Sequence, residues 1–204
     1  RDGHYGPGGV GFEPKGGLGK TVWIKTDLAG KPCRASFVYL QQPKGGEFRL
    51  TGDGQTFLEV NSRGDMMSKK VTHSFKQCPS KLRFVWSGKG RLRVFGWQIH
   101  SEKPGMSWTS VGINGARMTH LNHYSEKALP EALGLIEPDL LVFTFGLNIG
   151  SYPYGPNPKY AGGIQKVLSS LRAGLPTVPC LVVGPYPVAI NRKGRWVVSP
   201  TVQR

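Results

Sequence analysis

The sequence lacks long apolar segments and is poor in acidic residues. No hydrophobic run approaches the roughly 20 residues of a membrane-spanning helix, so no transmembrane segment is predicted. Acidic residues number 12 against 27 Lys and Arg, which gives the 204 residues a formal charge of +15. This excess favours an anionic partner, whether nucleic acid, an anionic glycan or an anionic cell surface. No long basic arm or recognised nucleic-acid motif is present, which disfavours nucleic acid.

Cysteine is scarce, and its spacing excludes the common metal and redox motifs. The three cysteines are Cys33, Cys78 and Cys180, and they form no Cys-x-x-Cys pair and no zinc-site spacing. Cys33 and Cys78 both fall in the β-rich first half and can pair if the compartment is oxidising. Cys180 lies in an apolar strand, where a buried free thiol is expected. The count therefore leaves the compartment open.

Glycine and proline are abundant, with 29 and 16 residues, and favour turns and β structure over helical bundles. Between residues 20 and 100 the sequence predicts short strands, several of which alternate apolar with polar residues. Glycine-rich turns separate them, which is typical of a β-sandwich or jelly roll of about eighty residues. The predicted strands are 21–24, 36–40, 47–50, 56–60, 81–86 and 92–99.

After residue 103 the pattern changes to alternating strands and helices. A continuous apolar strand, 140–145, is bounded by Pro138 and Gly146, which suggests burial on both faces, as in a parallel sheet. A loop rich in proline, glycine and tyrosine is expected from Gly150 to Pro158. The order strand-helix-strand-helix-strand predicts a parallel α/β unit. Its remaining elements are a strand from 110, a helix over 118–136 that Pro130 breaks or kinks, a helix over 159–173 and a strand over 178–183.

The histidines offer no complete metal site. His120 and His123 are three residues apart on a predicted helix, but no third ligand accompanies them. Solvent exposure is the expected state of both side chains. The sequence therefore predicts neither a metal nor a cofactor.

Two turns that follow strands of the parallel unit are the candidate functional site. Asn114-Gly115-Ala116 follows the first strand, and Gly146-Leu147-Asn148 follows the strand 140–145. Open α/β sheets bind ligands beyond the carboxyl ends of their strands, so both turns are expected at one sheet edge. The Gly115 N–H and the Asn148 amide are two donors that can stabilise an oxyanion during ester cleavage. Each residue taken alone is also an ordinary turn residue.

This pairing resembles the SGNH/GDSL hydrolase superfamily, in which a glycine N–H and a Gly-x-Asn block supply the oxyanion hole. Gly115 matches the first, and Gly146 with Asn148 match the second. The glycine-rich start, the β-rich insert and the later α/β unit resemble the bacterial peptidoglycan O-acetylesterases. The resemblance implies an SGNH-like domain formed by 1–18 and 104–204, interrupted by a carbohydrate-binding-like β domain at 19–103. It also implies an acetylated glycan as substrate and a periplasmic or extracellular location.

The same resemblance implies a serine in a Gly-Asp-Ser block and an Asp-x-x-His pair, and neither block occurs in these 204 residues. Asp2-Gly3-His4 has the wrong spacing for the pair. The chain begins at Arg1 without a methionine, which is typical of a fragment or a mature form. Taken alone, it is expected to hold the oxyanion half of an esterase site and not to turn over esters.

Two other functions stay open. The first is a non-catalytic glycan-binding protein, in which the positive charge and aromatic side chains form the binding surface. For these strand residues, however, core packing is the expected role. The second is a nucleic-acid-binding module, which the charge alone supports. The aromatic candidates are Trp23, Tyr39, Trp86 and Trp97.

Overall fold

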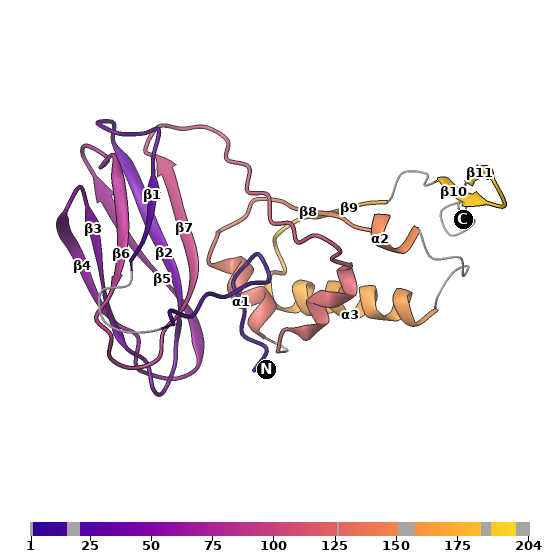
Figure 1. Ribbon diagram of the computed structural model, residues 1–204, viewed down its shortest axis with the longest axis horizontal. Helices are drawn as coiled ribbons and strands as arrows, with labels where there is room; N and C mark the ends of the chain where they lie inside the picture. The colour runs from indigo at the N-terminus through magenta and orange to yellow at the C-terminus, as the bar shows by residue number, and fades with distance from the viewer. Residues whose placement is uncertain (1, 16–20, 126, 151–157, 185–188, 199–204) are drawn as a thin grey trace. The chain divides into compact units, whose positions relative to one another are not determined.

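A computed structural model describes residues 2–15, 21–125, 127–150, 158–184 and 189–198. The chain forms two compact units, one from residues 4–111 and one from residues 1–3 and 112–204. Most of the regular structure is β-strand, with few helices (Figure 1). Most of the loop predicted from Gly150 to Pro158, at 151–157, lies outside the described residues. The assignment of the two units to an SGNH-like domain and an insert stays a prediction.

The first unit is a β-sandwich of two antiparallel sheets. One sheet has the strand order β1-β6-β3-β4 and the other has the order β5-β2-β7. Most consecutive strands lie in opposite sheets, and only β3 and β4 form a hairpin within one sheet. The strands are β1 (Thr21–Lys25), β2 (Cys33–Gln41), β3 (Glu47–Gly52), β4 (Gln55–Asn61), β5 (Met67–Phe75), β6 (Lys81–Trp86) and β7 (Arg93–Ser101).

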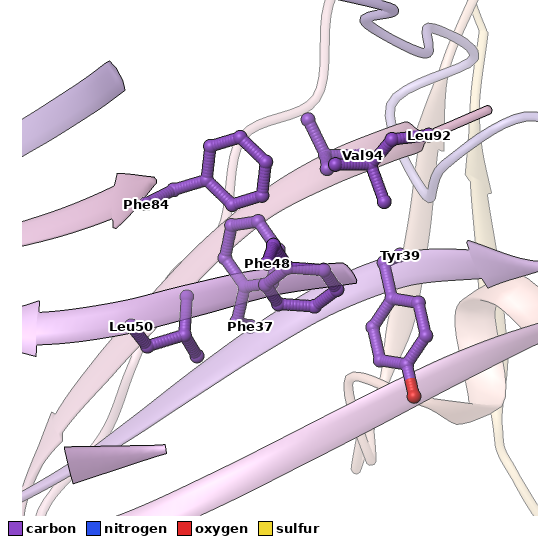
Figure 2. Packing of buried hydrophobic residues seen from close by; sticks show 7 residues of the cluster. All are labelled: Phe37, Tyr39, Phe48, Leu50, Phe84, Leu92 and Val94. Atoms are coloured by element: carbon purple, nitrogen blue, oxygen red, sulfur yellow. The ribbon is translucent and has the colours of Figure 1, made fainter. Parts of the chain in front are cut away.

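Aromatic side chains from both sheets form the core of the sandwich. Phe37 of β2 packs on Phe48 and Phe84 of the facing sheet, with ring centroids 5.3 and 5.2 Å apart. Figure 2 shows these three rings together. Burying a phenylalanine side chain contributes about 1.5–3 kcal/mol, so this cluster is a main source of stability for the sandwich. The buried cluster comprises Phe37, Tyr39, Phe48, Leu50, Phe84, Leu92 and Val94.

The six predicted strands are confirmed, and the structure adds β5, which sequence analysis missed. Lysine, serine and histidine occupy much of β5, so its apolar alternation is weak. The turn at Gly52-Asp53-Gly54 connects neighbouring strands as predicted. The glycine pairs at 45–46 and 88–90 do not, because they lie where the chain crosses from one sheet to the other.

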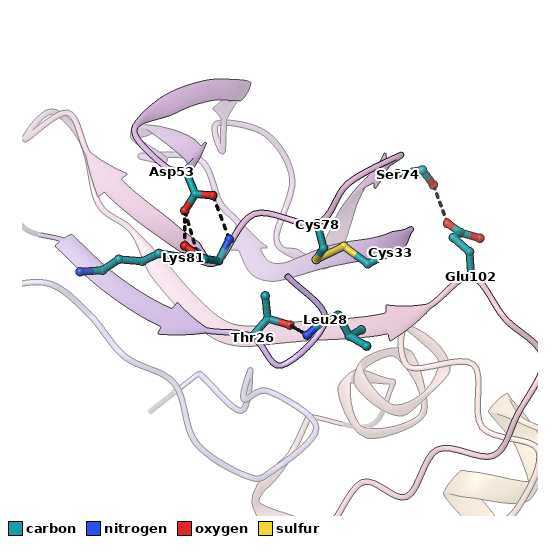
Figure 3. The surroundings of a disulfide bond; sticks show 9 residues. Thr26, Leu28, Cys33, Asp53, Ser74, Cys78, Lys81 and Glu102 are labelled. Atoms are coloured by element: carbon teal, nitrogen blue, oxygen red, sulfur yellow. Dashed lines mark hydrogen bonds between the residues drawn. A yellow bond between two sulfur atoms is a disulfide. The ribbon is translucent and has the colours of Figure 1, made fainter. Parts of the chain in front are cut away.

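A disulfide between Cys33 and Cys78 links β2 to the loop before β6, with the Cα atoms 5.4 Å apart. The pairing that the sequence allowed is therefore present. Beside it, the Asp53 carboxylate accepts hydrogen bonds from Ser80 N, Ser80 Oγ and Lys81 N at 2.8–2.9 Å (Figure 3). These bonds lower the pKa of Asp53 below its ordinary value of 3.8. Two independent attachments thus hold this end of the sandwich.

The second unit contains short helices and two pairs of strands. β8 and β9 are parallel, with Leu141 opposite Cys180 and Thr144 opposite Val183. β10 and β11 form a two-residue hairpin, in which Lys193 and Gly194 have positive φ. The elements are η1 (Met118–His123, a 3₁₀-helix), α1 (Ala128–Gly134), β8 (Leu141–Thr144), α2 (Leu147–Gly150), α3 (Pro158–Gly174), β9 (Cys180–Val183), β10 (Ala189–Arg192) and β11 (Arg195–Val198).

The predicted parallel α/β unit is present only in part. β8, α3 and β9 form the expected strand-helix-strand order with parallel pairing. The strand expected from residue 110 was wrong: this segment pairs with no strand in the described chain, and Val111 and Ile113 are about half exposed. Two apolar residues around a glycine are too few to secure a strand without a partner.

The helix predicted over 118–136 is two elements. Tyr124 has an extended backbone, with φ −65° and ψ 147°, and ends η1. Pro130 does not break the second helix, because it is the third residue of α1, where a backbone N–H has no intrahelical partner to lose. Cys180 is partly exposed and not buried as expected. Burial still raises the pKa of its thiol, which the charge of Arg172 opposes.

Helix α3 packs closely on η1 and α1. A Cβ added at Gly163 would lie 2.7 Å from Thr119 Cγ2, so only glycine allows this approach to η1. Asn122 Nδ2 donates to Gly163 O at 2.9 Å across the same contact. Val167 and Leu171, whose spacing of four residues puts them on one face of α3, are buried at 1% and 4% exposure. This packing holds η1 against α3.

Candidate functional site

The turn over residues 113–116 presents Gly115 to solvent. Ala116 N donates to Ile113 O at 2.9 Å, and Gly115 has φ +76°. A β-turn with positive φ at its third residue favours glycine there. A Cβ on Gly115 would meet nothing within 4 Å, and within the described chain its N–H has no hydrogen-bond partner. The Gly115 amide is therefore available to a ligand.

Asn148 lies where β8 leads into the short helix α2. Gly146 connects the two with φ +128°, a conformation that L side chains rarely adopt. The sequence predicted Asn148 in a turn, whereas the structure places it at the second position of the four-residue helix α2. Its side chain is exposed. Gly146 thus ends the strand as predicted, and helix α2 begins at the next residue, Leu147.

The two segments meet through one hydrogen bond. Asn148 Nδ2 donates to Ala116 O at 2.7 Å, although the two residues are 32 positions apart in sequence. A carboxamide nitrogen carries two hydrogens, so this bond uses one and leaves the second. Gly115 is the residue next to Ala116, and its N–H has no partner among the described residues. The two donors predicted from the sequence therefore belong to adjoining parts of one exposed surface.

The other side of the turn is attached to the interior of the unit. Met118, two residues after Ala116, is 1% exposed. Tyr160 of α3 forms a hydrogen bond with the Met118 backbone. Burial raises the pKa of the Tyr160 hydroxyl. The hydrogen bond to Met118 and the charge of Arg117 oppose this rise. Tyr160 therefore stays protonated at neutral pH. Sequence analysis missed this support, because Tyr160 falls within an ordinary amphipathic helix pattern.

Two donors on one surface can bind an anion or a developing oxyanion, but they supply no nucleophile. The identification of Gly115 and Asn148 as oxyanion donors stays a prediction. Among the described residues, no three His, Cys, Asp or Glu side chains are grouped as a metal site. His120 and His123 are exposed and stack on each other, with ring centroids 5.7 Å apart.

The aromatic side chains that sequence analysis considered for glycan binding differ in exposure. Tyr39 is in the core, and Trp86 and Trp97 are partly buried against it, as the packing interpretation expected. Trp23 is the exception. It is 52% exposed on the edge strand β1, and Lys81 Nζ lies 4.1 Å from its ring centroid.

Comparison with known proteins gives a fold and not a family. No protein-family model matches the chain, and no curated protein matches it significantly. The fold is similar to that of a peptidoglycan O-acetylesterase, with a TM-score of 0.65, 20% identity and 94% of this chain covered. The chain covers 51% of that protein's length.

Other structures resemble the chain more distantly. One is a family 35 carbohydrate binding module from Clostridium thermocellum, with 11% identity and a TM-score of 0.33. The match spans 45% of this chain and 88% of the module. Another is a family two carbohydrate esterase from the same organism, with 10% identity and a TM-score of 0.30. The match spans 87% of this chain and 74% of the esterase. Among the described helices, none is long and apolar enough to cross a membrane.

Proposed function

We propose that the protein is a carboxylic ester hydrolase of the SGNH type that removes O-acetyl groups from a cell-wall glycan. The observation that carries the proposal is the 2.7 Å hydrogen bond between Asn148 Nδ2 and Ala116 O, which holds the exposed asparagine beside the Gly115 turn. The fold shared with a peptidoglycan O-acetylesterase supports the same function. In this chain, Gly115 and Asn148 would be the oxyanion-hole residues.

In the proposed reaction, a serine hydroxyl attacks the acetyl carbonyl carbon while a histidine takes its proton. The carbonyl oxygen becomes an oxyanion, which accepts hydrogen bonds from the Gly115 N–H and the second N–H of the Asn148 carboxamide. The carbon–oxygen bond to the sugar then breaks, the histidine protonates the sugar oxygen, and water releases acetate from the serine. The serine and the Asp–His pair come from the SGNH resemblance and match no motif in these 204 residues.

The disulfide and the charge fit a function outside the cytoplasm. Disulfides persist in oxidising compartments and are rare in the cytosol, so Cys33–Cys78 supports a periplasmic or extracellular location. The formal charge of +15 suits an anionic glycan as partner. Neither feature favours nucleic acid over such a glycan.

The test measures hydrolysis of 4-nitrophenyl acetate by the full-length gene product and its Asn148→Ala variant. Loss of one oxyanion donor should reduce kcat by roughly 100- to 1,000-fold. Asn122→Ala is the matched control, because Asn122 also donates its carboxamide to a distant backbone carbonyl, Gly163 O, but does so in the η1–α3 contact. It should lower stability and leave kcat within about threefold, since it removes no transition-state contact. Equal kcat for Asn148→Ala and wild type would refute the assignment.

The second candidate function is glycan binding without catalysis. The exposed ring of Trp23 on β1 favours it, because Lys81 Nζ lies 4.1 Å from that ring and an exposed aromatic ring beside a cation can contact a glycan. The complete reading frame of the gene discriminates between the two functions. A Gly-Asp-Ser block before Arg1 and an Asp-x-x-His pair after Arg204 would support the hydrolase. A complete gene without these two blocks would support the binding protein.

A further inference from the structure

The sandwich contains a cleft that neither the sequence motifs nor the proposed hydrolase site uses. It has a volume of about 620 Å³ and lies between β4 and β5, the edge strands of the two sheets, next to the disulfide-linked loop. Pockets that bind small ligands measure about 300–1,000 Å³. The cleft is thus large enough for one or two sugar rings.

Three aromatic rings that contact one another line this cleft. His73 and Phe75 come from the same face of β5, with centroids 4.5 Å apart, and Phe57 of β4 lies 5.1 and 4.9 Å from them. All three side chains are only partly buried. Partly exposed aromatic rings offer an apolar surface on which the apolar face of a ring-shaped ligand can pack.

The polar groups that line the cleft are mostly uncharged. Gln55, Thr56 and Gln77 line it with exposed side chains, which supply both hydrogen-bond donors and acceptors. The carboxylate of Asp53 already accepts the three hydrogen bonds from Ser80 and Lys81. Among the described residues, no lysine or arginine lines the cleft, although the chain as a whole is strongly basic.

The cleft walls are held in place before any ligand arrives. Cys78, which lines the cleft, is bonded to Cys33, and its backbone exchanges two hydrogen bonds with the segment at 30–31, from Gly30 N to Cys78 O at 2.9 Å and from Cys78 N to Lys31 O at 2.8 Å. Binding to a preorganised site avoids the entropy cost of ordering loops.

We propose that this cleft binds an uncharged sugar ring of a glycan, with the apolar face of the sugar on Phe57 and Phe75. The hydroxyl or acetamido groups of the sugar would exchange hydrogen bonds with Gln55, Thr56 and Gln77. The proposal does not rest on ester hydrolysis, because the cleft contains neither Gly115 nor Asn148. It differs also from a basic surface around Trp23, which would select an anionic glycan.

The experiment titrates the full-length gene product with three probes by isothermal titration calorimetry. Two are uncharged, the N-acetylglucosamine trisaccharide and cellotriose, and the third is anionic trigalacturonate. We expect at least one uncharged probe to bind, and Phe57→Ala or Gln55→Ala/Gln77→Ala to weaken it roughly fivefold or more. Trp23→Ala is the matched control, an exposed aromatic on another strand, and should bind like wild type.

The proposal is overturned if neither uncharged probe binds at 5–10 mM, roughly the weak end of measurable affinity. It is also overturned if Trp23→Ala abolishes binding while Phe57→Ala retains it, or if only trigalacturonate binds. Should Phe57→Ala fail to fold, the exposed glutamine double variant decides instead. Hydrolysis of 4-nitrophenyl acetate is measured on each protein, so failure of the cleft and failure of the hydrolase assignment are distinguishable.

Discussion

Reducing the Cys33–Cys78 disulfide should destabilise the β-sandwich by about 4 kcal/mol. The bond joins residues 45 positions apart. In the chain-entropy treatment, a closed loop of this size removes about 13 cal/mol/K of entropy from the unfolded chain, which is about 4 kcal/mol at 25 °C. Both cysteines are almost fully buried, at 0% and 3% exposure. Reduction leaves both sulfur atoms in place, so the loss measures the covalent link and not a cavity.

The assay is urea denaturation followed by tryptophan fluorescence, with and without a phosphine reductant. Cys180→Ala serves as the control: it removes the partly exposed thiol outside the sandwich and should give the same difference between oxidised and reduced protein. A difference below about 1 kcal/mol would refute the loop-closure reasoning and indicate that the reduced chain retains structure when unfolded.

Two further predictions concern an acidic turn residue and a pair of helix glycines. Asp53→Asn should lower the Tm at pH 7. Because its folded pKa lies below 3.8, the carboxylate stabilises the fold above that pH, and the deficit should disappear as pH falls through the folded pKa. Asp65→Asn, exposed and without such bonds among the described residues, is the control at pH 7 and should leave the Tm unchanged in the same thermal melts. Gly163→Ala should destabilise by about 1–3 kcal/mol through overpacking against Thr119. Gly162→Ala, with open space around it, should stabilise by about 0.5–1 kcal/mol; equal effects in urea titrations would contradict this packing.

The sequence predicted the two turns of the candidate site and expected them at one sheet edge, but it did not predict the bond that joins them. Gly115 has positive φ and Gly146 ends a strand, and both features follow from glycine punctuation in the local sequence. The hydrogen bond from Asn148 to Ala116 joins residues 32 positions apart, and no local pattern encodes that distance. The strand expected before Gly115 was wrong, because a strand needs a neighbouring backbone and short apolar segments do not specify one.

The sequence by itself determined the strands whose apolar residues alternate, the buried face of α3 and the possible pairing of Cys33 with Cys78. These features depend on residues a few positions apart or on side-chain chemistry alone. Only the tertiary structure decided which strands share a sheet, and it placed β5 beside β2 despite its weak pattern. It also brought Phe57, His73 and Phe75 together at the edges of two sheets. The physical reason is that strands pair through backbone N–H and C=O groups, which are the same in every residue except proline. The choice of partner strand therefore depends on how the buried faces of the sheets pack across the whole domain.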